Sequence, residues 1–210
     1  MPGGANLPEL PPGPAAPAKG PHTPVFLIGM MAAGKTTVGR LLAQALHYTF
    51  LDCDAELEQR TGVRIATMFE LEGEAGFRER EAQLLEELTS RSDVVLATGG
   101  GVVLRPENRT LLRARGLVIF LDASGAEIAR RTQHDIGRPL LQVADRQARI
   151  DALLRERGPL YRATAHLRFR SPARNPRRLA NTILAHPALA PLLPPNGPSE
   201  AAAAAPGREP

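Results

Sequence analysis

Short apolar runs alternate with amphipathic segments through most of the chain. Between the apolar runs, hydrophobic residues recur at helical spacing, as from Thr37 to Leu46. Alternating strands and helices are typical of an α/β protein, in which helices cover both faces of a parallel sheet. We therefore expect a three-layer α/β/α fold with a central five-stranded parallel sheet. The five candidate strands are Val25 to Ile28, Tyr48 to Asp52, Val94 to Ala97, Val118 to Leu121 and His166 to Arg170.

The two ends of the chain differ from this pattern. Residues 1–24 contain eight prolines, and residues 189–210 are again rich in proline and alanine. Such a composition cannot supply a packed core and is typical of disordered tails. We therefore predict one folded domain at residues 24–187, with tails at residues 1–23 and 188–210.

The composition argues for small-molecule partners. The 210 residues are 43% hydrophobic, which is enough to form the core of one domain. The net charge of +4 would suit a nucleic-acid partner, but the arginines lie among acidic residues and aromatic residues make up only 4%. For these reasons we expect no nucleic-acid partner. No coiled-coil repeat or large apolar stripe is present, so we expect a monomer.

The chain also lacks the sequence patterns of a secreted or membrane protein. Its N-terminal segment has one lysine and no continuous apolar stretch, unlike a secretory signal. No apolar run reaches the roughly 18 residues that a membrane span needs. The single cysteine, Cys53, excludes an internal disulfide and fits a reducing compartment. These features predict a cytoplasmic protein without a membrane partner.

The stretch GMMAAGKTT at residues 29–37 carries the strongest chemical signal. The spacing of Gly29 from the triplet at residues 34–36 matches the phosphate-binding loop G-x-x-x-x-G-K-[ST]. The stretch also lies between a candidate strand and a candidate helix, which is the context that this loop requires. Its backbone N–H groups wrap an anion, Lys35 reaches the outer phosphates, and the Thr36 hydroxyl can ligate Mg²⁺. The stretch therefore predicts a nucleotide site.

Two aspartates follow at the end of the second candidate strand. Side chains alternate along a strand, so Asp52 and Asp54 are expected to project to one side while Cys53 points away. One carboxylate can hold Mg²⁺ through its water shell. The other can accept a hydrogen bond from a substrate hydroxyl or take its proton. The alternative is that Asp54 caps the helix that follows.

Further patterns along the chain each have a structural alternative. Three consecutive glycines, residues 99–101, leave bare backbone on which another molecule can lie, unless they form only a flexible turn. Arg78 and Glu81 are three residues apart on a predicted helix, where the glutamate can fix the guanidinium. Spacing alone favours a solvated salt bridge for this pair. One helix is expected to end at Gly73 and Gly76, with a new one beginning near Phe77.

The segment after the fourth candidate strand is predicted to form a mobile lid. Residues 130–141 are polar in the middle and are broken by Gly137 and Pro139. Arg138 then becomes a candidate to swing over the phosphates, where a planar and permanently charged donor stabilises spreading negative charge. A plain surface loop is the alternative.

In their order and spacing, these motifs resemble those of the shikimate kinase family, within the nucleoside monophosphate kinase-like branch of P-loop proteins. The resemblance runs from residue 24 to residue 185 and rests on GMMAAGKTT, FLDCD, GFRERE, ATGGG, RPLL and RGPLYR followed by RNP. It implies transfer of the ATP γ-phosphate to the 3-hydroxyl of shikimate, which gives shikimate 3-phosphate and ADP. It also implies one Mg²⁺ ion and a place in chorismate and aromatic amino acid biosynthesis.

The resemblance implies a role for each matched residue. The implied catalytic residues are Lys35, Asp54 and Arg138. The implied ATP-binding residues are Met31, Ala32, Ala33, Gly34, Lys35, Thr36, Arg131, Arg138, Arg174 and Pro176. The implied shikimate-binding residues are Asp54, Arg78, Gly100 and Arg157, and the implied Mg²⁺-binding residues are Thr36 and Asp52.

Within these sets the resemblance also implies how some residues act. Arg78 and Arg157 clamp the shikimate carboxylate, and Glu81 orients Arg78. Arg138 corresponds to a lid arginine that covers the phosphates. Arg131, like Arg174 and Pro176, matches a position near the adenine.

One position departs from the family pattern. Many relatives carry glycine where this chain has Ala32. If that glycine takes a positive φ angle, alanine there costs about 1 kcal/mol of loop strain and alters nucleotide affinity modestly.

Two other functions remain open from the sequence. A kinase of the same fold can act on gluconate or a nucleoside monophosphate, because the fold alone does not choose the acceptor. A non-catalytic regulator can use ATP as a conformational ligand. The paired aspartates, Arg78 and the triple glycine argue against the first alternative, and the acceptor-orienting carboxylate of Asp54 argues against the second.

Overall fold

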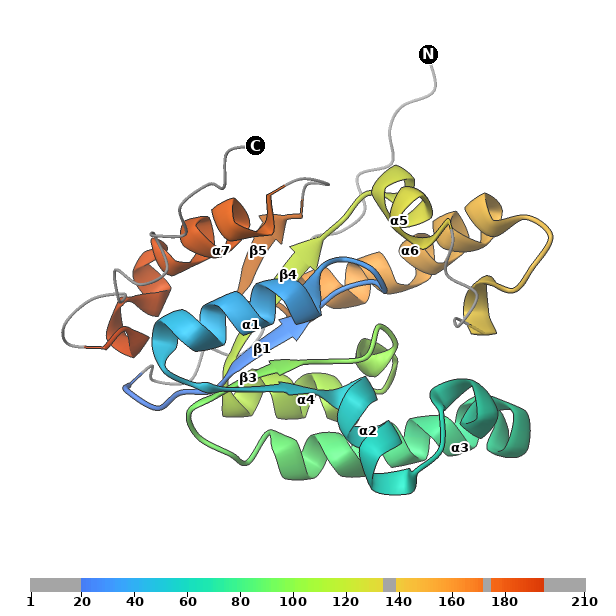
Figure 1. Cartoon of the computed structure of the whole chain (residues 1–210), viewed down its shortest axis with the longest axis horizontal. Helices are drawn as coiled ribbons and strands as arrows, with labels where there is room; N and C mark the ends of the chain where they lie inside the picture. The colour runs from blue at the N-terminus through green and yellow to red at the C-terminus, as the bar shows by residue number, and fades with distance from the viewer. Residues whose placement is uncertain (1–19, 134–138, 172–174, 195–210) are drawn as a thin grey trace, which may run out of the picture.

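A parallel sheet of five strands forms the centre of the molecule (Figure 1). The computed structural model describes residues 20–133, 139–171 and 175–194. All strand pairs in the sheet are parallel, and the strand order is β2-β3-β1-β4-β5. The predicted five-stranded sheet is confirmed, with strand ends moved by one residue at most. The strands are β1 (Val25–Ile28), β2 (Thr49–Asp52), β3 (Val94–Ala97), β4 (Leu117–Asp122) and β5 (Leu167–Arg170).

Helices cover both faces of this sheet. In Figure 1, α1 lies in front of the sheet and packs against α7, whereas α4 lies behind it. The expected three-layer α/β/α architecture is therefore confirmed. None of the described helices is apolar over enough length to cross a membrane. The α-helices are α1 (Lys35–Leu46), α2 (Cys53–Thr61), α3 (Ile65–Leu88), α4 (Pro106–Arg115), α5 (Gly125–Thr132), α6 (Arg146–Thr164) and α7 (Pro176–Leu184), and the short 3-10 helices are η1 (Val102–Leu104), η2 (Pro139–Leu141) and η3 (Pro187–Leu192).

The register of the sheet brings three strand ends to one edge. The central strands β1 and β3 are buried along their whole length, as expected for strands that are covered on both faces. Leu27 of β1 and Asp52 of β2 both lie opposite Ala97 of β3. The segments that follow these three strands, including the glycine loop and the triple glycine, therefore leave the sheet side by side. Ligands of open α/β sheets bind at this edge.

A kink divides α3 into two parts. Gly73 has φ 69° and ψ −176°, which is outside the helical range, and the helix resumes directly after it. The predicted break at Gly73 is confirmed, but the predicted new start near Phe77 lies several residues too late. The kink brings the rings of Phe69 and Phe77 together, with their centroids 4.6 Å apart.

The packed part of the chain extends beyond the predicted boundary at residue 187. Helix η3 follows α7, and the side chains of Leu189 and Leu192 are buried in the core. The sequence analysis assigned this segment to a disordered tail because it is rich in proline and alanine, and so did not recognise its two buried leucines. At the other end, His22 lies within hydrogen-bond distance of Asp93 (Nδ1 to Oδ1, 2.8 Å), so packing also begins before residue 24.

Candidate active site

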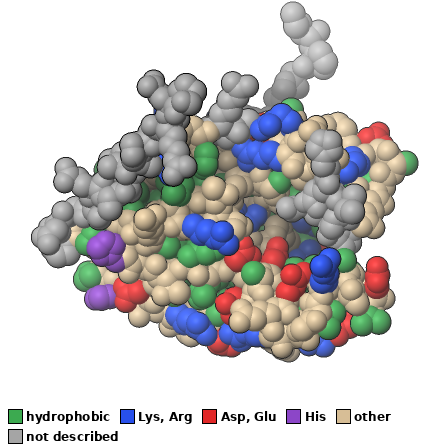
Figure 2. Space-filling model, in the orientation of Figure 1, with side chains coloured by type: hydrophobic (Ala, Val, Ile, Leu, Met, Phe, Trp, Pro, Cys, Tyr) green, Lys and Arg blue, Asp and Glu red, His purple; other side chains and the backbone are tan. Residues whose placement is uncertain are grey.

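Two cavities meet at the carboxyl edge of the sheet. The loop cavity, of about 420 Å³, is lined by Gly34, Lys35, Thr36, Asp52, Arg131 and Pro176 among others. The arginine cavity, of about 510 Å³, is lined by Phe69, Phe77, Arg78, Glu81, Gly101 and Arg157 among others. Met31, Asp54 and Gly100 line both cavities. Figure 2 shows a hollow on this face of the molecule, with acidic and basic side chains around it.

The glycine loop has the geometry of a phosphate-binding loop. It leads from β1 into α1, which begins at Lys35, so the N-terminus of α1 faces the loop cavity. The Lys35 side chain is nearly buried, and its Nζ donates hydrogen bonds to Gly29 O (2.8 Å) and Met30 O (2.9 Å). The ammonium group is thereby held at the base of the loop. Loop N–H groups, helix N-terminus and ammonium together suit a polyphosphate.

Two residues from distant elements brace the outer side of this loop. Arg131 Nη1, at the end of α5, donates to Ala32 O at 2.7 Å. Its Nη2 donates to Ser171 O at 3.2 Å, and Ser171 Oγ donates to Ala33 O at 2.6 Å. The sequence predicted Arg131 for the nucleotide site, and the residue does line the loop cavity together with Pro176. Ser171 was missed, because no motif marks the residue after the last strand.

Ala32 adopts a left-handed backbone conformation, with φ 57°. An alanine in this region costs about 1 kcal/mol relative to glycine. We therefore expect Ala32→Gly to raise the free energy of unfolding by about 1 kcal/mol, with a change of less than about threefold in KM for ATP. Urea unfolding of the two proteins measures the difference. An unchanged or lower stability in the glycine variant would show that the relief of strain does not exceed the entropy that glycine adds to the unfolded chain.

The two aspartates reach the site through a different local structure from the one predicted. Strand β2 ends at Asp52 and α2 begins at Cys53, so alternation along a strand does not apply. Asp52, rather than Asp54, caps α2: its Oδ1 accepts from Asp54 N at 3.1 Å. Cys53 points into the core, where burial raises the pKa of its thiol. Asp54, in the first turn of the helix, is left exposed to both cavities.

Thr36 and Asp52 form an oxygen pair in the loop cavity. Thr36 Oγ1 donates to Asp52 Oδ2 at 2.7 Å. Hydroxyl and carboxylate oxygens are the donors that Mg²⁺ accepts, and this ion takes only one or two protein ligands alongside water and phosphate oxygens. The residues present therefore fit Mg²⁺ bound together with a nucleotide. No group of three or more histidine, cysteine or acidic side chains able to hold a metal occurs in the part of the chain that the structure describes.

The arginine cavity contains a buried ion pair. Arg78 Nη1 donates to Glu81 Oε2 at 2.8 Å, and its Nη2 donates to Glu74 Oε1 at 3.0 Å. Only 3% of the Glu81 side chain is exposed, so the alternative of a solvated salt bridge is wrong. Burial raises the pKa of Glu81, against the opposing charge of Arg78. The pairing holds the Arg78 guanidinium in one orientation, as predicted.

Several buried polar atoms of this cavity have no hydrogen-bond partner among the residues that the structure describes. They are Arg78 Nε, Glu81 Oε1 and Arg157 Nε. A buried donor or acceptor without a partner costs about 1–3 kcal/mol, so such atoms are typical of a site that binds a polar ligand. Arg157, on α6, is 2% exposed and its Nη1 makes a long hydrogen bond of 3.4 Å to Gly100 O. Two buried guanidinium groups suit a carboxylate, which they can bind with paired hydrogen bonds.

The triple glycine lets side chains of the site itself lie on bare backbone. A Cβ atom at Gly101 would stand 2.2 Å from Arg78 Cζ. A Cβ atom at Gly99 would stand 2.3 Å from Glu81 Oε1. The sequence predicted close approach by another molecule, whereas the structure assigns at least two of the three glycines to contacts within the chain. The alternative of a merely flexible turn does not account for these contacts.

Tyr161 supports the site, because it contacts the backbone of Gly100, which lines both cavities. The sequence analysis missed this residue. Its hydroxyl donates to Gly100 O, and its ring stacks on Phe120 with centroids 5.1 Å apart. The side chain is buried, and burial raises the pKa of Tyr161, so the hydroxyl stays a donor. Tyr161 follows Arg157 by four residues on α6, hence on the same face of the helix. That spacing places the two side chains next to each other, but only the contact with Gly100, 61 residues away, shows that Tyr161 supports the site.

Part of the predicted site lies outside the described residues. These are Arg138 and Arg174, together with the centre of the predicted lid at residues 130–141. The first residues of that segment belong to α5 and the last to η2. Leu140 of η2 lines the arginine cavity, so this segment does reach the site.

Comparisons with known proteins agree with this geometry. The sequence model of the shikimate kinase family matches residues 31–187. A shikimate kinase of Burkholderia pseudomallei (strain 1710b) is 52% identical over 167 residues, which cover 80% of this chain and 91% of that protein. A shikimate kinase of Aromatoleum aromaticum is 57% identical over 143 residues, which cover 68% and 82%. The structure of Acinetobacter baumannii shikimate kinase in complex with shikimate superimposes with a TM-score of 0.76 and 47% sequence identity. The match covers 77% of this chain and 90% of that chain.

Proposed function

The chain belongs to the shikimate kinase family, and from this premise we propose that it transfers the γ-phosphate of ATP to the 3-hydroxyl of shikimate. The products are shikimate 3-phosphate and ADP. This proposal rests on one observation: Asp54 lines both cavities at the place where they meet. One cavity suits a polyphosphate and the other suits a carboxylate, so their shared wall is where the donor and the acceptor hydroxyl can meet.

ATP binds in the loop cavity. The backbone of residues 31–34 and the N-terminus of α1 surround the phosphates, and the Lys35 ammonium neutralises charge on the transferred group. The adenine end lies toward Arg131 and Pro176, which line this cavity. The family resemblance implies that Arg174, which lies outside the described residues, is near the adenine as well. It also gives Arg138, which likewise lies outside the described residues, the role of covering the phosphates and excluding water, which would otherwise hydrolyse ATP.

Shikimate binds in the arginine cavity. Arg78 and Arg157 hold its carboxylate, and the Gly100 backbone contacts a ring hydroxyl. This clamp turns the 3-hydroxyl toward Asp54, whose carboxylate accepts the hydroxyl proton as the oxygen attacks the γ-phosphorus in line with the leaving ADP. Glu81 keeps the Arg78 guanidinium oriented for this clamp. Most of the rate enhancement then comes from position and charge neutralisation.

Thr36 and Asp52 would hold one Mg²⁺ ion with the nucleotide. When bound, the ion neutralises phosphate charge and helps to align the phosphates. The Asp52 carboxylate, which also caps α2, fixes the position of this site relative to Asp54.

One chain lines both cavities, so we propose that a monomer is sufficient for the reaction. The partners are the two small-molecule substrates. The free and buried Cys53 fits a reducing cytoplasm, where we place the enzyme.

Gly101→Ala tests the carboxylate clamp. The φ angle of Gly101 is −101°, which alanine adopts without strain, and the three atoms nearest to the new methyl group all belong to the Arg78 guanidinium. We expect KM for shikimate to rise about tenfold or more, with a change of less than about twofold in KM for ATP. Steady-state kinetics with each substrate varied in turn provides both values. An unchanged KM for shikimate would show that Arg78 does not bind the acceptor in this position.

Product analysis tests the proposed reaction itself. The purified protein is incubated with ATP, shikimate and Mg²⁺, and the product is examined by ³¹P–¹H correlation NMR. A single phosphate ester at the 3-position is expected, and none when EDTA is in excess over Mg²⁺. Phosphate at another hydroxyl would overturn the assigned orientation, and undiminished product in EDTA would overturn the metal requirement.

A further inference from the structure

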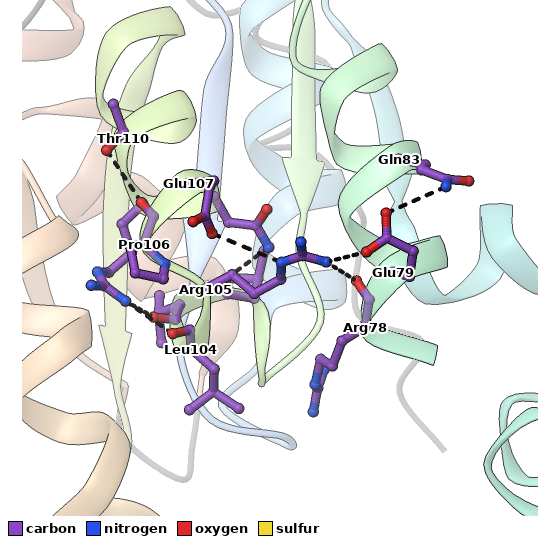
Figure 3. Close-up of polar contacts among 12 residues, drawn as sticks. Arg78, Glu79, Gln83, Leu104, Arg105, Pro106, Glu107 and Thr110 are labelled. Carbon is purple, nitrogen blue, oxygen red and sulfur yellow. Dashed lines mark hydrogen bonds and ion pairs between the residues drawn. The ribbon is translucent and has the colours of Figure 1, made fainter. Parts of the chain in front are cut away.

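Figure 3 shows a side chain outside both cavities that connects two parts of the acceptor site. Arg105 lies between η1 and α4, and its guanidinium points toward α3. Its Nη1 donates to Glu79 Oε2 at 2.7 Å and to the backbone oxygen of Arg78 at 3.4 Å. Its Nε lies 3.9 Å from Glu107 Oε2. The segment after the triple glycine is thereby joined to α3 at the residue that carries the buried guanidinium.

A second contact runs in the opposite direction between the same two segments. The Arg78 side chain extends from α3 and lies on the backbone of Gly101, where a Cβ atom would stand 2.2 Å from its Cζ. The Arg105 side chain extends from the end of η1 and reaches the backbone of Arg78. The two arginines therefore fix the separation of α3 from the glycine turn at one place.

The glycine turn is itself fixed to α4. Asn108 is buried, and its Nδ2 donates to Val102 O at 3.1 Å. Arg109 Nη1 donates to Leu104 O at 3.1 Å. These bonds connect η1 to α4, so Arg105 joins α3 to a segment that is itself held in place by hydrogen bonds.

Stability alone does not account for this arrangement. The Arg105 side chain is 35% exposed and its main ionic partner Glu79 is 59% exposed, and ion pairs with this exposure contribute little to stability. Its hydrogen bond and charge lower the pKa of Glu79. The contact with the carbonyl of Arg78 is the feature that concerns the site.

We propose that Arg105 is a positioning residue for the acceptor carboxylate. It holds the backbone of Arg78 at a set distance from Gly101, so that the guanidinium meets the carboxylate without first reorganising. This proposal rests on the proposed function, because it takes the shikimate carboxylate as the ligand of Arg78. Loss of Arg105 should weaken shikimate binding and leave ATP binding intact.

The test compares Arg105→Met with a matched control, Arg115→Met. Arg115 also joins α4 to α3, through a backbone oxygen (Glu86 O, 2.7 Å) and the carboxylate of the same residue, and its side chain is 33% exposed. It stands at the far end of α4, away from the glycine turn. We expect R105M to raise KM for shikimate about fivefold, with kcat and KM for ATP within about twofold. R115M should lower the melting temperature to a similar extent and leave KM for shikimate unchanged.

Two further variants show whether Arg105 acts through Arg78. In an Arg78→Lys background, R105M should raise KM for shikimate by less than about twofold, because the side chain that it positions is already altered. Arg105→Lys keeps the positive charge toward Glu79 but lacks the planar guanidinium, so its KM for shikimate should lie between those of the parent and R105M. If R105M does not fold, Arg105→Lys takes its place in the test. Full additivity of R105M and R78K would overturn the proposal.

The remaining outcomes are equally decisive. A normal KM for shikimate in R105M, with an active wild-type protein, would overturn this proposal alone. An equal rise of KM in R115M would assign the effect to general loss of packing and would also overturn it. A wild-type protein that does not phosphorylate shikimate would overturn the proposed function, and this proposal with it.

Discussion

Asp54→Asn is expected to lower kcat for shikimate phosphorylation about 10³-fold, within the range for loss of a general base. The side chain stands where the two cavities meet, so its carboxylate is placed to receive the hydroxyl proton. Asparagine keeps the size of the side chain but cannot take up a proton. KM for ATP should stay within about threefold of the parent, since the phosphate loop is untouched. Initial rates of ADP release, with each substrate varied, measure both effects.

Glu58→Gln is the matched control for this variant. Glu58 lies on the same helix, α2, and is also acidic and exposed, but it lines only the arginine cavity. Its loss should leave kcat within about threefold of the parent. If D54N kept a kcat as high as this control, Asp54 would be neither the base nor the residue that positions the hydroxyl.

Lys35→Met is expected to lower kcat about 10²–10³-fold, the usual loss when one group that stabilises transition-state charge is removed. Methionine has a similar length and can occupy the same nearly buried space, so the fold should survive. The variant removes both the ammonium charge and its bonds to Gly29 O and Met30 O. Single-turnover kinetics at saturating ATP separate the loss in the chemical step from any loss of ATP affinity.

Arg40→Met provides the control on the same helix. Arg40 is exposed on α1 and lies over the Phe50 ring, with its Cζ 5.6 Å from the ring centroid. The substitution therefore removes a positive charge from α1 without altering the phosphate loop. It should leave the single-turnover rate within about twofold of the parent. A K35M rate as high as that of R40M would show that the ammonium group does not act on the transferred phosphate.

The features that the sequence predicted well are those encoded by contiguous residues. The phosphate loop needs only a strand, a glycine-rich turn and a helix in succession, and the structure has all three between Val25 and Leu46. The Arg78–Glu81 pair follows from helical spacing, although only the packing shows that Glu81 is buried. Asp54 was placed at the site for an incorrect reason. The argument extended the alternation of a strand to residue 54, whereas β2 ends at Asp52 and α2 begins at Cys53.

The features that the sequence could not predict depend on contacts between distant segments. Tyr161 and Gly100 are 61 residues apart, and Arg131 and Ala32 are 99 apart. Such pairs meet only because the strand order of the sheet brings their elements together, and the spacing of residues in one sequence does not encode that order. For the same reason the burial of Leu189 was not predicted, because it depends on the elements packed around η3 and not on the proline-rich sequence next to it.

The most direct test of the account is the initial rate of ADP release by the purified protein with ATP and Mg²⁺. Parallel reactions contain shikimate, gluconate, AMP, CMP or no acceptor. We predict release that depends on shikimate and exceeds the rate with every other acceptor by at least about 10²-fold. The rigid ring of shikimate sets its 3-hydroxyl at a fixed distance from the carboxylate that Arg78 and Arg157 bind, whereas gluconate is an open chain and AMP and CMP have no carboxylate. Release with gluconate or a nucleotide in place of shikimate would contradict the assigned acceptor site, and ATP binding without release in any reaction would contradict the proposed catalysis.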